Sequence, residues 1–230
     1  TAPGSTFKLV SATAALDSGV LQPVERVNSL VAFDKVDKEH PAKCWKTSGS
    51  HGHLDVTDAI GVSCNYFFYE MGYRMSLKNG VYKSEKGLKT LEKYAKMFGL
   101  GETSGIELYE YEPHISDSDS IRSAIGQGTN NFTPAQLARY ITTVANEGTC
   151  YNLTIVDKVK DLDGNIILDN EAEIYNKLSI SSRIFSLLKS GLYKVVYSPE
   201  SSISYLFNKL SFTVAGKTGT AQEICILCTI

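Results

Sequence analysis

Apolar residues recur at helical spacing along much of this chain. From Ser5 to Asp17 they surround the helix axis almost completely, which is typical of a buried helix, and Gly19 follows as a C-terminal stop. Between Glu85 and Phe98 they occupy one face, as in an amphipathic helix. Residues 133–146 begin with a capping threonine and a proline in the first turn. Less complete helical patterns cover residues 55–60, 66–75 and 180–196.

Strand patterns are fewer and shorter. Residues 153–159 and 166–168 flank Asp163-Gly164, a dipeptide typical of hairpin turns. Residues 212–215 are typical of a short strand entering a glycine-containing segment, whereas residues 20–54 are polar and are expected to be irregular. Helices and strands in separate runs predict an α+β or α/β domain whose sheet is covered by helices.

Composition mainly excludes functions. The 230 residues are 43% hydrophobic, which suits one globular domain. Basic and acidic residues nearly balance, 23 against 25, and no basic stripe with interleaved aromatics indicates nucleic-acid binding. The basic run from Lys83 to Lys96 alternates with Glu85 and Glu92, as on a solvated helix face. No stretch approaches the roughly 18 apolar residues of a membrane span.

The five cysteines do not predict a disulfide framework, because their number is odd and they are scattered. Cys225 and Cys228 have CxxC spacing in an apolar tail with no second pair and no nearby histidine, so we expect neither a redox nor a metal role there. No cofactor is expected. One alternative stays open, because a zinc site could be built from Cys44, His51, His53 and Cys64. Their spacing matches no standard pattern, and a polar loop with buried thiols is the competing interpretation.

Ser5 and Lys8 are the first pair with candidate chemistry. A serine hydroxyl is a weak nucleophile near neutral pH and needs a base beside it. Residues three apart share a helix face, so Ser5 and Lys8 can meet, and the positive N-terminus of the helix would stabilise a developing alkoxide at Ser5. Lys8 can accept the proton only if burial or nearby cations lower its pKa. An SxxK pair also arises by chance with an ordinary solvated lysine, so the pair alone does not establish catalysis.

Two further short motifs offer complementary groups. Lys217 could hold a substrate carboxylate together with Thr218 and Thr220, while Gly219 would let a substrate backbone pass close to the chain. The amides of Ser5 and Thr220 could form an oxyanion hole. Ser63 could relay a proton between two lysines, and Asn65 could hold Lys8 and a substrate carbonyl. The glycine spacing before Lys8 and Lys217 does not fit a phosphate-binding loop.

In the order SxxK, SxN, KTG, the three motifs are the signature of class A β-lactamases and penicillin-binding proteins. The surrounding residues extend the likeness, and residues 1–222 resemble the transpeptidase domain of class B penicillin-binding proteins. A weaker similarity to elongation-type members lies in Cys44-Trp45-Lys46 and His51-Gly52-His53. The segments that carry the resemblance are Pro3 to Lys8, Ser63 to Phe68, Phe98 to Gly101, Gly105 to Leu108, Gly126 to Gly128, Thr133 to Ala138 and Ala215 to Gln222.

The resemblance implies a β-lactamase/transpeptidase-like α+β fold, with helices covering an antiparallel sheet. It also implies a D,D-transpeptidase, in which Ser5 attacks the D-Ala-D-Ala amide of a peptidoglycan stem peptide and an amine from a second stem resolves the acyl-enzyme into a cross-link. β-Lactams would acylate the same serine. Lys8 would be the base, Ser63 and Asn65 the relay, and Lys217 with Thr218, Gly219 and Thr220 the carboxylate and oxyanion site.

This sequence departs from the family pattern at both ends. Sheet strands that precede the SxxK helix in the family would lie before Thr1, and residues 223–230 form an unrelated apolar tail, as after a frameshift or truncation. We therefore expect N-terminal and C-terminal sheet strands to be missing and acylation by this chain alone to be impaired. No signal peptide precedes Thr1. In a full-length protein the family implies a membrane anchor, an extracytoplasmic location at the bacterial cell membrane and cell-wall synthesis proteins as partners.

Two other functions use the same trio. A serine β-lactamase would need a carboxylate placed to activate water, and no motif for one stands out. The separation between Ser5 and Lys217 is also longer than expected of a compact lactamase. A non-catalytic β-lactam-sensing domain would bind the drug covalently without cross-linking anything. Sustained hydrolysis would favour the lactamase, and release accelerated by an amine acceptor would favour the transpeptidase.

Overall fold

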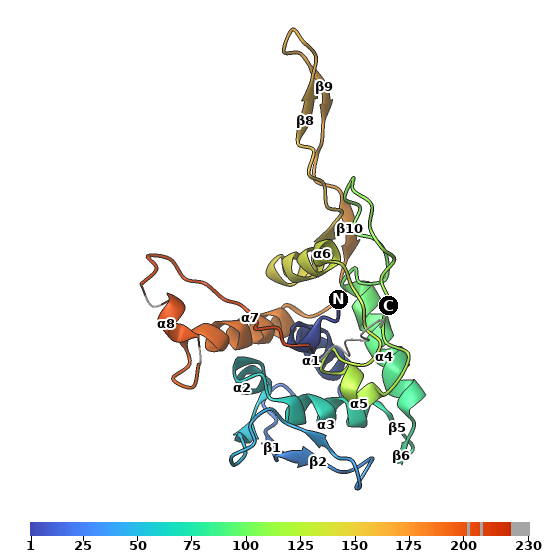
Figure 1. Ribbon diagram of the computed structural model, residues 1–230, viewed down its shortest axis with the longest axis vertical. Helices are drawn as coiled ribbons and strands as arrows, with labels where there is room; N and C mark the ends of the chain where they lie inside the picture. The colour runs from blue at the N-terminus through green and yellow to red at the C-terminus, as the bar shows by residue number, and fades with distance from the viewer. Residues whose placement is uncertain (202, 208, 222–230) are drawn as a thin grey trace, which may run out of the picture.

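The computed structural model describes residues 1–201, 203–207 and 209–221, which form a helical body with one projecting hairpin (Figure 1). The predicted tail at 223–230, with Cys225 and Cys228, lies outside the described residues. At the centre of the body is α1 (Lys8–Asp17), which the chain enters through a 3₁₀ turn, η1 (Gly4–Phe7). The other helices are α2 (Val56–Gly61), α3 (Asn65–Met75), α4 (Ser84–Met97), α5 (Ser120–Ser123), α6 (Pro134–Ala145), α7 (Ser182–Tyr197) and α8 (Ser204–Phe207).

The central helix is buried, as its apolar pattern predicts. Every residue from Lys8 to Leu16 is buried, and α2, α3, α4 and α7 pack around α1. Its alanines at 12, 14 and 15 leave room for these neighbours to approach closely. One detail differs from the predicted single helix, because the first turn is 3₁₀ and Ser5 lies in η1. In a 3₁₀ turn residues three apart are eclipsed, so Ser5 and Lys8 still lie on one side.

The other predicted helices are confirmed, with ends within a few residues of those expected. In α6, Thr133 and Gln136 form a reciprocal capping box, with Pro134 at the first position. Asp55 caps α2 through the backbone N–H groups of Thr57 and Asp58. The predicted solvated face of α4 carries the ion pairs Lys89–Glu85 and Lys96–Glu92. None of the helices in the described residues is both long and apolar enough to cross a bilayer.

The described strands form five antiparallel pairs, which with the helices confirm an α+β fold. The predicted hairpin at Asp163-Gly164 is confirmed and projects from the body (Figure 1). The strand pairs are β1 (Val27–Ser29) with β4 (Gly52–Leu54), β2 (Ala32–Phe33) with β3 (Ala42–Lys43), β5 (Leu77–Lys78) with β6 (Val81–Tyr82), β7 (Thr149–Tyr151) with β10 (Ile174–Lys177), and β8 (Lys158–Lys160) with β9 (Ile166–Asp169).

Two strand predictions are wrong. Residues 20–54 were expected to be irregular, yet they hold β1 to β4, whose two- and three-residue strands are too short to give an alternating pattern. Residues 212–215 form no strand, because no described strand lies beside them to complete a ladder. Two hydrogen bonds to α7 hold this segment instead, from Val214 N to the Tyr197 hydroxyl and from Gly216 N to the Leu192 carbonyl.

Candidate active site

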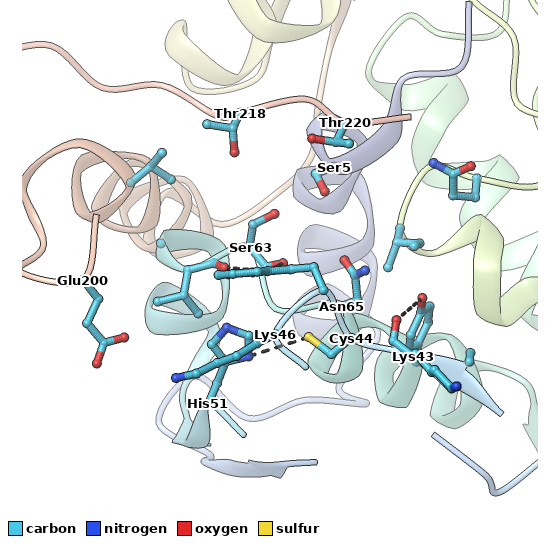
Figure 2. Close-up of a pocket in the computed structure, with 18 of the residues that line it drawn as sticks. Ser5, Lys43, Cys44, Lys46, His51, Ser63, Asn65, Glu200, Thr218 and Thr220 are labelled. Atoms are coloured by element: carbon cyan, nitrogen blue, oxygen red, sulfur yellow. Dashed lines mark hydrogen bonds between the residues drawn. The ribbon is translucent and has the colours of Figure 1, made fainter. Parts of the chain in front are cut away.

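A cavity of about 1120 Å³ lies where several distant parts of the chain converge. Its walls come from η1, from β3 and the loop between β3 and β4, from the turn between α2 and α3 with the first turns of α3, from residues between 122 and 127, from residues between 195 and 203, and from residues 218 and 220. Figure 2 shows Ser5 and Ser63 facing each other across this space, with Thr218 and Thr220 beyond Ser5. This volume is that of a site for a ligand larger than most drugs.

Lys8 sits beneath the cavity, fully buried at the start of α1. Its ammonium donates to the Ser63 carbonyl at 2.8 Å, to Ser63 Oγ at 3.1 Å and to Asn65 Oδ1 at 2.7 Å. These three acceptors use all three N–H groups of a protonated lysine. Among the described residues no hydrogen bond joins Ser5 to Lys8. The structure therefore joins Lys8 to Ser63 and Asn65 of the SxN motif, and its described hydrogen bonds do not include one with Ser5.

Ser63 lies in the sharp turn between α2 and α3, as its predicted place between two helices requires. Its φ of 52° is in the left-handed region, which a residue with a Cβ rarely adopts. This conformation turns both the carbonyl and the hydroxyl of Ser63 toward Lys8. Asn65 is the first residue of α3, and Cys64 caps this helix by accepting from the N–H of Phe67.

Lys217 completes the polar centre from the far end of the chain. Its ammonium donates to Ser63 Oγ at 2.8 Å, so the Ser63 hydroxyl lies between two lysine amino groups. Lys217 also donates to the carbonyl and the hydroxyl of Thr218, at 3.1 and 3.3 Å. The structure thus gathers Lys8, Ser63, Asn65 and Lys217 in one hydrogen-bonded group. Thr218 joins this group through Lys217, whereas Ser5 and Thr220 line the same cavity without a described hydrogen bond to the group.

Burial shifts both lysines toward the neutral form, and repulsion by Lys217 adds to the shift of Lys8. The pKa of Lys8 lies well below its usual value, mainly because the side chain is buried. The positive charge of Lys217 lowers the pKa of Lys8 further. Burial also lowers the pKa of Lys217 to about 8. Two amines that lose their protons easily, on either side of one hydroxyl, can pass a proton through it in either direction.

A close backbone contact joins the first and last motifs. Gly4 has a φ of 53°, and a Cβ placed on it would fall 2.7 Å from the carbonyl carbon of Thr220. Gly126, with a φ of 76°, packs in turn against the Gly4 carbonyl, while Gly4 N donates to the Gly126 carbonyl at 3.1 Å. At Gly219 a Cβ would lie 3.4 Å from the Thr6 methyl group. The KTG segment therefore lies directly against η1, and the missing side chain of Gly4 allows this approach, whereas a Cβ at Gly219 would make only an ordinary contact.

Several cavity-lining residues were not found from the sequence. They include Tyr69, Arg122 and Glu200, which no local motif marks because each is a single residue in a different element. Trp45 also lines the cavity, and the sequence marks it only through the weak similarity to elongation-type members. The segment Gly126 to Gly128 was noted only as part of the family resemblance, and the positive φ of Gly126 and Gly128 is the physical reason for these two glycines.

Three of the four candidate zinc ligands cluster below Ser63. The ligand atoms of Cys44, His51 and Cys64 all lie within 4.8 Å of one another. His53 is not among them, because it lies on β4 opposite Asn28 of β1. A hydrogen bond from Cys64 lowers the pKa of Cys44, while the same contact raises that of Cys64. Two thiols and an imidazole suit zinc, and a fourth ligand would be needed to complete a tetrahedral site.

Comparisons with known proteins agree with this geometry. A family model described as "Penicillin binding protein transpeptidase domain" matches residues 1–225. The chain is 29% identical over 236 residues to stage V sporulation protein D of Bacillus subtilis, covering 96% of this chain and 33% of that protein. It is 26% identical over 235 residues to the peptidoglycan D,D-transpeptidase MrdA of Escherichia coli K12, covering 96% of this chain and 35% of that protein.

A solved structure is also similar. Penicillin-binding protein 2B of Streptococcus pneumoniae strain R6 superposes with a TM-score of 0.82 at 25% identity, over 97% of this chain and 39% of that one. The chain thus spans about a third of the length of the curated relatives it matches.

Proposed function

Because the chain belongs to the penicillin-binding protein transpeptidase domain family, class B, we propose that it is a peptidoglycan D,D-transpeptidase that acts through an acyl-enzyme on Ser5. The observation that carries this proposal is the Ser63 hydroxyl held between the amino groups of Lys8 and Lys217, at the cavity that Ser5 also lines. Its substrates are stem peptides ending in D-Ala-D-Ala, and β-lactams acylate the same serine.

The first half of the reaction forms the acyl-enzyme. Neutral Lys8 accepts the Ser5 proton while Ser5 Oγ attacks the carbonyl carbon of the penultimate D-Ala. A neutral amine has only two N–H groups, so one of its three present contacts opens and its lone pair becomes available to Ser5. The backbone N–H groups of Ser5 and Thr220 hold the oxyanion. The proton then passes through Ser63 to the departing amine, and the C–N bond breaks.

The second half reverses these proton transfers. An amine of a second stem peptide attacks the ester carbonyl and gives up a proton through Ser63. Ser5 Oγ leaves and recovers its proton from Lys8, so Ser5 and Lys8 return to their starting states. Lys217, Thr218 and Thr220 bind the terminal carboxylate of the donor stem during the first half. Asn65 Oδ1, at 2.7 Å from Lys8 Nζ, keeps the Lys8 amino group in place throughout both halves.

This chain should acylate slowly. Residues 211–221 carry the carboxylate-binding motif and form no ladder with any described strand, and Thr218, Gly219 and Thr220 are exposed. A segment without a strand partner holds its side chains and amides less firmly than a paired strand does, so the oxyanion donors are less pre-organised. We therefore expect a lower rate constant for the chemical step, while the cavity itself is still formed.

The rate of acylation at sub-saturating penicillin should fall as the pH rises above about 8, because binding weakens. Lys217 must carry its charge to hold the ligand carboxylate, and its pKa is about 8. Above that pH the apparent dissociation constant for a penicillin should rise by about tenfold per pH unit, while the first-order step stays unchanged or increases, because Lys8 acts as the neutral amine. Acylation at pH 6 to 10, followed at several penicillin concentrations, measures both quantities.

Lys217→Arg serves as the matched control for this pH dependence. A guanidinium stays charged throughout the range, so the loss of binding above pH 8 should disappear in that variant. A dissociation constant that does not change between pH 7 and 10 in the unmodified chain would show that Lys217 does not hold the carboxylate.

The direct test of the proposed function is covalent labelling with a fluorescent penicillin. We expect a slow, time-dependent adduct with the mass of the intact drug, located by peptide mapping on the fragment that contains Ser5. An amine acceptor such as a D-amino acid should speed its release. No adduct after prolonged incubation, or an adduct on another residue, would refute the acyl-enzyme at Ser5.

The same assay separates the two rival functions. Sustained hydrolysis of nitrocefin would favour a β-lactamase, and an adduct that no acceptor releases would favour a sensor domain. Glu200 is the only acidic side chain among the described residues that line the cavity, and Figure 2 shows its carboxylate pointing away from Ser5. It is therefore poorly placed to activate a deacylating water, which supports the transpeptidase.

The location and partners of the whole protein follow from the proposed activity. Stem peptides are cross-linked outside the cytoplasmic membrane, so the domain would work at the extracytoplasmic face of a bacterial cell membrane with other cell-wall synthesis proteins. Labelling of intact cells with a membrane-impermeant penicillin probe would test this location.

A further inference from the structure

Trp45 is the single tryptophan of the chain and lies at the rim of the cavity. Its side chain is 59% exposed, yet its only polar atom points inward. Indole Nε1 donates to two successive carbonyl oxygens, that of Val62 at 3.2 Å and that of Ser63 at 3.1 Å. The ring therefore covers the turn between α2 and α3 from the solvent side.

This turn has a conformation that needs support. Ser63 has a φ of 52°, and a residue with a Cβ persists in this region only where surrounding contacts hold it there. Two donors converge on its carbonyl oxygen, the Lys8 ammonium at 2.8 Å and the Trp45 indole N–H at 3.1 Å. The same conformation turns the Ser63 hydroxyl toward Lys8 and Lys217. Any relaxation of the carbonyl would therefore also displace the hydroxyl.

The loop that carries Trp45 is itself fixed to the same region. The Tyr69 hydroxyl donates to the Lys43 carbonyl at 3.2 Å, and Cys44 Sγ lies 4.0 Å from Cys64 Sγ. The His51 ring packs edge-on against the Trp45 ring, with 5.1 Å between their centroids. Trp45 is thus held by neighbours on both sides rather than free to swing into solvent.

We propose that Trp45 is a positioning residue for the reaction, which holds the left-handed turn at Ser63 so that the Ser63 hydroxyl stays between Lys8 and Lys217. The expected effect on acylation rests on the proposed function. The expected effect on the Ser63 turn rests only on the contacts described above. Trp45 acts on the proton relay through the backbone of Ser63, and its N–H group is the part that matters.

Trp45→Phe tests this assignment, because phenylalanine keeps an aromatic ring and loses the donor. Acylation by a fluorescent penicillin at several concentrations gives a first-order rate constant and a dissociation constant. We expect the rate constant to fall about tenfold, as a loss of positioning in the transition state requires, with the dissociation constant changed less than about twofold. Thr47→Ala is the matched control, since Thr47 lies in the same loop, is exposed and does not line the cavity.

Two kinetic outcomes would overturn the proposal. A weaker dissociation constant with an unchanged rate constant would make Trp45 only a wall of the ligand site. Equal effects of Trp45→Phe and Thr47→Ala would make the loop, and not the indole N–H, responsible. Circular dichroism melting of each variant checks that the fold is retained.

A second measurement does not depend on acylation. The backbone N–H groups of Ser63 and Cys64 donate to Ile60 and Ala59 at 3.1 and 3.0 Å, so their hydrogen exchange reports on this turn. Exchange of both should accelerate at least about fivefold in Trp45→Phe and stay unchanged in Thr47→Ala. Unchanged exchange in Trp45→Phe refutes the positioning role even if Ser5 is acylated. Accelerated exchange without any acylation supports it and refutes the proposed function instead.

Discussion

Replacing Lys8 with methionine should lower the rate of Ser5 acylation by at least about 100-fold and leave the protein folded. General-base catalysis by a positioned side chain contributes about 10² to 10⁴ in rate, and Lys8 is the only amine that η1 and α1 place beneath Ser5. Methionine fills a similar volume without a charge. Labelling time courses with a fluorescent penicillin, together with thermal unfolding, measure the two effects.

The expected stability of this variant follows from the cost of burying an amine. Burial holds the pKa of Lys8 well below its usual value, which means that the site disfavours the charged form. Removing the amine relieves that cost, but Asn65 Oδ1 loses its lysine donor and the Ser63 carbonyl keeps only the Trp45 N–H, so the two effects oppose each other. We expect a change in melting temperature of only a few degrees in either direction.

Lys93→Met is the matched control for Lys8→Met. Lys93 lies on the exposed face of α4, where its ammonium contacts the ring of Tyr94. Its replacement should leave acylation unchanged. If Lys8→Met reacted with penicillin at more than about a tenth of the original rate, another group would have to accept the Ser5 proton, and the assignment of Lys8 as the base would be wrong.

Gly126→Ala should destabilise the protein by about 2 to 4 kcal/mol and reduce acylation with it. Gly126 has a φ of 76°, and an added Cβ would clash with the Gly4 carbonyl and fall 2.8 Å from Phe7 Cβ. Both neighbours belong to η1, the turn that presents Ser5. Relief of the clash must therefore displace η1 or residues 124–128. Denaturant unfolding measures the stability change, and the labelling assay measures the displacement of Ser5.

Gly164→Ala isolates the contribution of the clash. Gly164 has a φ of 86° in the projecting hairpin, and an added Cβ would meet nothing within 4 Å. The Gly164→Ala substitution should therefore lower the free energy of unfolding by only about 1 kcal/mol, the conformational cost of alanine in the left-handed region. It should not reduce acylation. Equal destabilisation by the two substitutions would show that Gly126 is needed for its backbone angle alone and that the packing against η1 is unimportant.

The sequence predicted the helices well because their apolar periods and caps are local. Thr133 with Pro134 and the stop at Gly148 bracket α6, and the alanine-rich stretch after Lys8 could only be buried. The strands β1 to β4 were missed since two or three residues are too few to show a period. The strand expected at 212–215 failed for another reason, because a β-ladder depends on a partner segment that local sequence does not report.

The candidate site was also predicted only in part. Motif order identified Ser5, Lys8, Ser63, Asn65 and Lys217 as one group, and four of them are hydrogen-bonded together. The contact between Ser5 and Lys8 was expected from spacing, but spacing cannot show that Ser63 and Asn65 occupy the donors of Lys8. Trp45 was beyond reach for a similar reason, because its role depends on which way one indole nitrogen points.

The backbone contact between Gly4 and Thr220 also sets when this site can form. The two residues are 220 − 4 = 216 positions apart, so their meeting closes a loop that spans nearly the whole chain. Such long-range closures tend to come late in folding, since local helices form faster than distant segments find each other. On a ribosome, Ser5 would emerge well before Lys217 exists. The proposed nucleophile would then stay inert until the KTG segment has been synthesised and has docked against η1.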